Sequence, residues 1–233
     1  MNKAIFWDFD GTLVHGTGYL VKNILYDALT KLGYDIDIEK VRYHLSHKSK
    51  GYTWDTPEIS YTDDIGQKWW DKLFGHFDLL YENYNVSKED RERANSYFKS
   101  RILDSKHYTL FDDAVNVLSK CKELGYKNYI LSNNYPELPL VIKDMGLDEY
   151  FSDYIVSANV GYDKPRIEIF QYALKLADFP DDCYMIGDNP VADIQGGKSA
   201  GMKTVLVHNQ NTDVSDADYI CENLSEILDK IEL

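Results

Sequence analysis

The stretch that most constrains the fold lies near the start of the chain, at residues 5–13, and reads Ile-Phe-Trp-Asp-Phe-Asp-Gly-Thr-Leu. A short apolar run that ends in turn residues is typical of a buried strand, although a buried helical segment has the same pattern. Ligands of parallel α/β sheets bind just beyond the carboxyl ends of the strands. Asp8 and Asp10 would lie at such an end, and both carboxylates could face one site because alternate residues of a strand point the same way. An Asx turn that only closes the strand fits Asp-x-Asp-Gly equally well.

Three later segments repeat this arrangement, in which a strand-like run is followed by polar side chains. The runs are residues 129–131, 154–157 and 183–186. They are followed by Ser132 and Asn133, then by Lys164, and then by Asp188 and Asp193. A hydroxyl, an amine and a pair of acids are thus each expected beyond a different strand. Taken singly, each cluster also has an ordinary explanation, such as a turn, a surface lysine or an acidic helix start.

From residue 108 onward, strand-like runs alternate with helix-like segments. Strands are expected at residues 126–131, 154–157, 183–186 and 203–207, and helices at 112–124, 137–145, 167–176, 191–200 and 222–231. Parallel strands joined by helices require crossover connections, which are right-handed. The sequence therefore predicts an α/β fold with a doubly wound parallel sheet.

Residues 15–105 lack this alternation and contain only helix-like patterns, at residues 24–32, 38–46, 62–80 and 87–100. Ser87 begins a capping-box pattern for the last of these. The glycine-rich residues 14–18 could act as a hinge. We expect an α/β core domain of residues 1–14 and 106–233, with a helical cap domain, residues 15–105, inserted after the first strand. A chain of 233 residues is long enough for both.

The four polar clusters together resemble, in identity and in order, the motifs of the haloacid dehalogenase-like (HAD) hydrolase superfamily, most of whose members are phosphatases. The resemblance covers residues 3–14 and about 108–208, whereas residues 15–105 resemble the family's caps only in composition. It implies a Rossmann-like core with a helical cap. It also implies an enzyme that hydrolyses phosphomonoesters, so that a small phosphorylated metabolite is the expected partner.

The two acids of the first motif suit phosphoryl transfer. A carboxylate can attack phosphorus and form an acyl phosphate, and Asp8 is the expected nucleophile. Asp10 is the expected general acid and base, which gives a proton to the departing oxygen and later takes one from water. By resemblance, Asp8 and Asp188 bind Mg2+ through their carboxylates and Asp10 binds it through its backbone carbonyl. Oxygen ligands of this kind are those that Mg2+ prefers.

The other motif residues receive supporting roles from the same resemblance. Ser132 and the backbone amide of Asn133 are expected to donate hydrogen bonds to phosphoryl oxygens. Lys164 is expected to project over the site, and the proline that follows it favours an extended backbone there. Thr12 would support the turn after the first strand, and Asp193 would orient Lys164 or the water shell of the metal.

The chain departs from the family pattern at His15, where many relatives have an aspartate followed by serine or threonine. We expect His15 to be exposed rather than bound to substrate, and we expect His44 and His47 at the surface as well. Aromatic residues are frequent in the expected cap. Of these, Trp69 is expected to pack in the interior, and Trp54 is the better candidate for stacking on the organic part of a substrate.

The balance of charges restricts the partners. Lysine and arginine total 25 against 39 acids, a formal net charge of −14, which argues against nucleic acid or an anionic membrane surface as a partner. The three cysteines, Cys121, Cys183 and Cys221, have no metal-binding spacing, and an odd number of thiols suits a reducing compartment. We see no signal-like leader and no apolar stretch of ~18 residues, so the expected location is the cytoplasm.

Two alternatives to a phosphatase stay open at this level. A sugar-phosphate mutase of the same superfamily would also have Asp10, and it would need basic cap residues such as Arg42, Lys48 or Lys50 to hold a second phosphate. A phospho-accepting receiver-type signalling module also uses aspartates, a hydroxyl and a lysine on a parallel sheet. Receivers are much shorter, however, and have no helical insertion after the first strand.

Overall fold

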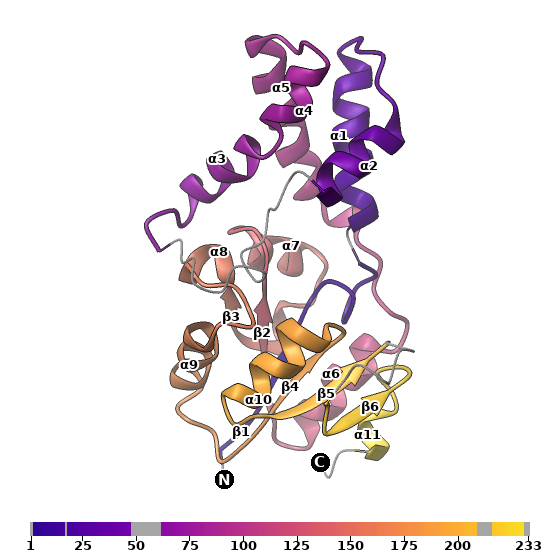
Figure 1. Cartoon of the computed structure of the whole chain (residues 1–233). Coiled ribbons are helices and arrows are strands. Elements are labelled where there is room, and N and C mark those ends of the chain that lie inside the picture. Colours follow the sequence, from indigo (N-terminus) through magenta and orange to yellow (C-terminus); the bar gives the residue numbers. More distant parts are fainter. Residues whose placement is uncertain (1, 17, 48–61, 209–215, 231–233) are drawn as a thin grey trace.

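The computed structural model describes residues 2–16, 18–47, 62–208 and 216–230. Its centre is a six-stranded sheet in the order β3-β2-β1-β4-β5-β6, in which every neighbouring pair is parallel. The strands are β1 (Lys3–Trp7), β2 (Lys127–Ser132), β3 (Phe151–Val156), β4 (Asp182–Gly187), β5 (Lys203–Val207) and β6 (Tyr219–Cys221). The predicted α/β fold with a doubly wound parallel sheet is confirmed (Figure 1).

Helices cover both faces of this sheet, and the alternation of side chains along β1 shows why. Ile5 and Trp7 belong to one buried cluster, and Ala4 and Phe6 belong to another on the opposite face. The first cluster is closed by α6 (Ala114–Glu123), α7 (Leu138–Asp144) and α11 (Ile227–Lys230), and the second by α9 (Ile167–Leu176). A parallel strand that is buried on both faces reads as a continuous apolar run, which is the pattern seen at residues 4–7.

The second half of the chain differs from expectation at three elements. Residues 190–195 form a π-helical turn, and α10 (Gly196–Ser199) follows it, where one helix was predicted. The helix predicted over residues 222–231 is the much shorter α11. The strand before it, β6, was not predicted, because three residues are too few to show a period. Asp113 rather than Asp112 precedes α6, and its carboxylate accepts hydrogen bonds from the backbone and hydroxyl of Ser225.

The described helices between residues 18 and 102, here called the helical insertion, stand above the carboxyl ends of the strands (Figure 1). They are α1 (Gly18–Lys31), α2 (Ile38–His47), α3 (Gln67–Gly75), α4 (Asp78–Asn83) and α5 (Lys88–Ile102). The N-cap of α5 is Ser87, as predicted, and its hydroxyl accepts from the backbone of Asp90. Glu137, at the start of α7, joins the insertion to the sheet domain because it accepts from the indole of Trp70 at 2.8 Å and pairs with Lys99 at 2.9 Å.

Some expectations about the insertion need correction, and others lie outside the described residues. The single helix expected over residues 62–80 is two helices. Trp69 is half-buried and packs against the core, as expected, and its neighbour Trp70 is fully buried. The expectation that His44 lies at the surface was wrong: it is buried, with Nε2 3.3 Å from the backbone oxygen of His76. Trp54, Lys48, Lys50 and the side chain of His47 lie outside the described residues.

Two further observations concern the cysteines and the lengths of the helices. Cys121 and Cys221 are buried, Cys183 is half-buried, and all three are free thiols. Among the helices that the structure describes, none is both long and apolar enough to cross a membrane.

Candidate active site

Asp8 and Asp188 lie side by side because two neighbouring strands end at the same level. Trp7 is aligned with Ile186 in the β1–β4 pair, and the next backbone N–H, that of Asp8, donates to the Ile186 oxygen at 2.9 Å. Asp8 therefore leaves β1 where Asp188 leaves β4. Carboxylate oxygens of Asp8, Asp188 and Asp193 all lie within 4.8 Å of one another. The predicted acids of the first and fourth motifs are thus brought together at the carboxyl edge of the sheet.

Two glycines make room for these acids. Gly11 has a φ of +81°, which side chains rarely adopt, and a Cβ there would lie 2.5 Å from Asp188 Oδ2. A Cβ on Gly187 would lie 2.1 Å from Asp193 Oδ2. The carboxylates of Asp188 and Asp193 can therefore pack against bare backbone. Thr12, fully buried in the same turn, points its hydroxyl to Asp188 Oδ1 at 3.4 Å.

Lys164 is a buried cation rather than a lysine that projects into solvent. It is 1% exposed, and its Nζ lies 3.0 Å from Asp8 Oδ1 and 2.6 Å from Asp193 Oδ1. Asn133 fixes the backbone at this lysine with two hydrogen bonds: its Nδ2 donates to the Lys164 oxygen at 2.9 Å, and its Oδ1 accepts from the Lys164 N–H at 2.7 Å. The sequence analysis predicted a role only for the backbone amide of Asn133. In the structure, the Asn133 side chain also holds the backbone of Lys164 in position.

The turn that carries Asp193 is organised by Asn189, which sequence reasoning did not single out. The Asn189 side chain accepts from the backbone N–H groups of Val191 and Ala192, and the backbone N–H of Asn189 donates to Asp193 Oδ2 at 3.0 Å. Both oxygens of the fully buried Asp193 therefore accept hydrogen bonds, one from Lys164 and one from this turn. The signal that could have found Asn189 is the Asn-Pro pair, a frequent turn and helix start.

Asp10 and Ser132 are the remaining predicted side chains of the site. Asp10 follows β1 in a turn that Val14 closes, and its Oδ2 accepts from Asn134 Nδ2 at 2.7 Å. Ser132 is the last residue of β2, next to β1, and it is buried. All eight predicted site residues thus gather at one edge of the sheet, whereas Asn134 was missed.

Burial and crowding of like charges shift the titration of the cluster. Burial raises the pKa of Asp188 to about 6, and the charge of Asp8 adds to that rise. Burial also raises the pKa of Asp193, and Lys164 opposes this. For Lys164, burial alone would lower the pKa, but Asp193 and Asp8 outweigh it and the pKa is raised. Three carboxyl groups thus crowd around the one ammonium group of Lys164.

The oxygen-rich cluster fits a hard divalent cation. Asp8 and Asp188 offer carboxylate oxygens without nitrogen or sulfur ligands, which is the donor set of Mg2+. A bound cation would also relieve the repulsion from Asp8, which adds to burial in raising the pKa of Asp188. Asp193 completes the acidic cluster, but it already accepts from Lys164 and from the turn at Asn189.

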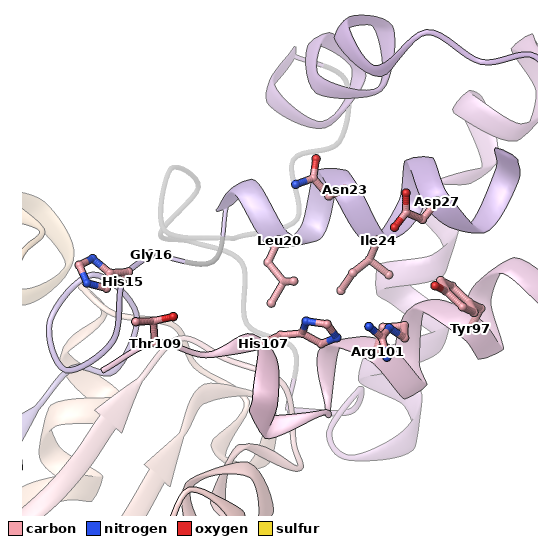
Figure 2. Close-up of a pocket in the computed structure, with 10 residues that line it drawn as sticks. All are labelled: His15, Gly16, Leu20, Asn23, Ile24, Asp27, Tyr97, Arg101, His107 and Thr109. Carbon is pink, nitrogen blue, oxygen red and sulfur yellow. The ribbon is translucent and has the colours of Figure 1, made fainter. Parts of the chain in front are cut away.

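A pocket of about 370 Å³ lies at the base of the helical insertion, away from these acids (Figure 2). His15 and Thr109 border it at the two connections between insertion and sheet, and α1 and α5 contribute side chains that include Ile24 and Arg101. None of the eight predicted site residues lines it. His15 is exposed, as expected, and its ring lies 4.1 Å from that of Phe111.

A model of the family described as haloacid dehalogenase-like hydrolase matches residues 2–201. The chain belongs to this family. It is therefore a hydrolase with the HAD fold, and the resemblance drawn from its four motifs is confirmed. A crystal structure of a magnesium-bound HAD-hydrolase from Bacillus subtilis covers 98% of this chain and 97% of that one, with a TM-score of 0.76 at 19% identity, which supports the fold alone.

Curated relatives of this HAD hydrolase carry phosphatase names. A phosphoserine phosphatase of Thermus thermophilus is 30% identical over 132 residues, which are 56% of this chain and 51% of that protein. A glyceraldehyde 3-phosphate phosphatase of Pyrococcus abyssi is 28% identical over 216 residues, 88% of this chain and 81% of the relative. The match thus spans about half the length of the first relative and most of the second.

The close approach of Gly11 to Asp188 gives a test of the site. Gly11→Ala should cost roughly 1–2 kcal/mol in folding free energy because of the positive φ, and it should displace the Asp188 carboxylate and reduce turnover. Gly146→Ala is the matched control: its φ is +76° but nothing lies within 4 Å of its Cβ. Thermal unfolding and activity are measured on both. Equal loss of activity in the two variants would show that the contact with Asp188 does not matter.

Proposed function

We propose that this HAD hydrolase is a Mg2+-dependent phosphatase that acts on a small phosphomonoester through a phosphoryl group carried on Asp8. The observation that carries the proposal is the placement of Asp8 between Lys164 at 3.0 Å and the acidic cluster of Asp188 and Asp193. Asp10, two residues further, separates the chain from haloacid dehalogenases, which lack an acid at that position.

In the proposed mechanism, Asp8 attacks phosphorus while Asp10 protonates the departing oxygen. Asp10 then takes a proton from the water that hydrolyses the acyl phosphate. Lys164, Ser132 and the Asn133 amide would bind the phosphoryl oxygens, and the Lys164 charge would stabilise the negative charge that spreads over them. Mg2+, held by Asp8, Asp188 and the Asp10 carbonyl, would neutralise further charge on the phosphoryl group. Asp193 would act by fixing Lys164.

The direct test is phosphate release from a panel of phosphomonoesters, with Mg2+ and with EDTA. The names of the relatives put phosphoserine and glyceraldehyde 3-phosphate first, beside sugar phosphates, phosphoglycolate, nucleoside monophosphates and pyridoxal phosphate. We expect metal-dependent release from at least one small ester. A folded, metal-loaded protein that releases phosphate from none of them would contradict the proposal, and conversion of a sugar phosphate to its isomer would indicate the mutase. Membership in a hydrolase family removes the support for a receiver module.

We also propose that residues 15–105 act as a cap that selects the organic part of the substrate, above the core formed by residues 1–14 and 106–233. The position of the helical insertion over the carboxyl edge of the sheet supports this division (Figure 1). The cytoplasm is the proposed location, with a small phosphorylated metabolite and not nucleic acid as partner, in keeping with the net charge of −14.

The titration of Asp188 predicts how metal binding depends on pH. The pKa of Asp188 is raised to about 6 from an ordinary value near 4. Between these two pH values, the metal-free folded protein keeps a proton on Asp188 that the unfolded chain has lost. Stability without metal should therefore fall as the pH rises from about 4 to about 6. Mg2+ needs the ionised carboxylate, so the rise in Tm that Mg2+ causes should be larger at pH 7.5 than at pH 5. Asp188→Asn is the control and should abolish most of that rise at both values.

A further inference from the structure

Asn134 is in direct contact with Asp10, although no motif points to it. Its side-chain Nδ2 donates to Asp10 Oδ2 at 2.7 Å, across 124 positions of the sequence. Asn134 lies two residues beyond the end of β2 and is 6% exposed. An amide N–H can donate to a carboxyl oxygen whether the acid is protonated or ionised.

The orientation of this amide group is determined by its other contact. Asn134 Oδ1 accepts from the backbone N–H of Tyr135 at 3.0 Å. Because a backbone N–H can only donate, the oxygen of the amide must face Tyr135 and the NH2 group must face Asp10. The backbone of Asn134 is held as well: its N–H donates to Ser157 Oγ at 3.1 Å, and its oxygen accepts from the Ala158 N–H at 3.3 Å.

We infer that Asn134 is the positioning residue for the general acid. This inference rests on the proposed function. By donating to Oδ2, Asn134 makes that oxygen the carbonyl-like one, so that the transferable proton of Asp10 is carried on Oδ1. It also limits rotation of the carboxyl group about its last side-chain bond. A donor held by three further hydrogen bonds supplies this orientation before the substrate arrives, which is the usual way in which a supporting residue assists catalysis.

Both proton transfers then use the same oxygen. As the bond from Asp8 to phosphorus forms and the ester bond breaks, the Oδ1 proton moves to the leaving oxygen and an alcohol departs. Asp10 is left as a carboxylate, and the Asn134 N–H faces its negative charge. In the second step, Oδ1 takes a proton from water as the water oxygen bonds to phosphorus and the bond to Asp8 breaks. Inorganic phosphate leaves, and Asp8 and Asp10 return to their starting states.

The expected effect of removing Asn134 depends on the leaving group. An alkoxide needs a proton as it departs, whereas p-nitrophenolate is stable without one. For Asn134→Ala, kcat/KM should fall roughly 10- to 100-fold for the best alkyl ester of the panel. For p-nitrophenyl phosphate the fall should be less than about threefold. The reason is that kcat/KM reports the steps up to departure of the leaving group, and p-nitrophenolate departs without a proton from Asp10. Asn159→Ala is the matched control, since its exposed amide donates to the Pro136 oxygen and not to a catalytic group.

Two further variants separate positioning from a structural effect. Asn134→Asp retains the acceptor for Tyr135 and loses the N–H donor to Asp10, so it should give the same selective loss even where Asn134→Ala does not fold. In an Asp10→Asn background, Asn134→Ala should change kcat/KM for the alkyl ester by less than about twofold. Provided that the wild-type protein is active, the inference would be overturned if the Asn134 variants lost activity equally on both esters, or lost none. Wild-type protein inactive on both esters would instead remove the proposed function, and the inference with it.

Discussion

Asp8→Asn is expected to abolish phosphatase turnover while the protein remains folded. An amide oxygen is a far weaker nucleophile than a carboxylate, and removal of a covalent nucleophile costs on the order of 10⁴-fold or more in kcat. The fold should persist because the change preserves the shape of the side chain and removes one of the negative charges crowded beside Asp188. The pKa of Asp188 should fall, since the Asp8 charge contributes to its rise.

The assay for this prediction measures phosphate release and the labelling of protein by a radioactive phosphoryl donor under acid quench. Wild type should retain acid-stable label on Asp8, and the Asp8→Asn variant should retain none. Asp10→Asn is the matched comparison, because it has the same chemical change two residues away. It should be slower in both steps but should still accept label. Near-normal activity of the Asp8→Asn variant would refute the covalent mechanism.

Lys164→Met is expected to destabilise the protein by about 3–5 kcal/mol and to abolish activity. The ammonium is buried and lies between two carboxylates, at 2.6 Å from Asp193 and 3.0 Å from Asp8. Removal of the ammonium leaves the fully buried Asp193 without a cation. Either Asp193 then takes up a proton, or the surrounding structure opens and lets water reach the carboxylate. The measurement is urea unfolding at pH 7.5, together with turnover of the best ester.

Lys120→Met is the control for this effect. Lys120 and Glu123 are also 2.6 Å apart, but their side chains are 50% and 58% exposed, so the loss of this pair should change stability by less than about 1 kcal/mol. The double variant Lys164→Met/Asp193→Asn should regain part of the stability, because it removes the unpaired charge, but it should regain no activity. If Lys164→Met and Lys120→Met were equally stable, the buried ion pair would have no structural importance.

Much of the fold was predictable from the sequence because it depends on local pattern. Apolar runs ending in turn residues located β1 to β5 to within a few residues, although β6 was missed. Asp8 and Asp10 could be found because both follow one strand, two positions apart. The order of the four motifs made the family recognisable. Ser87 was identified as a helix cap from its own tetrapeptide, which forms the expected hydrogen bond.

Other features follow from packing between distant segments, and the sequence could not supply them. Trp70 is more deeply buried than Trp69 because α3 turns Trp70 toward the sheet domain. There, Glu137 accepts a hydrogen bond from the Trp70 indole and the Tyr135 ring stacks on it. His44 is buried within the insertion, where its Nε2 meets the backbone oxygen of His76, 32 positions away. Local pattern is silent on both, since it reports which face of an element is apolar and not which neighbour that face meets.

The types of residue that follow each strand could be found in the sequence: two acids, a hydroxyl with an amide, a lysine and a second acidic pair. How these groups are held depends on the packing of distant segments. This packing buries Lys164 between Asp8 and Asp193, joins Asn133 to Lys164 across 31 positions, and joins Asn134 to Asp10 across 124. The physical reason is that residue type and spacing set local geometry, whereas burial and long-range hydrogen bonds exist only once the strands are paired side by side.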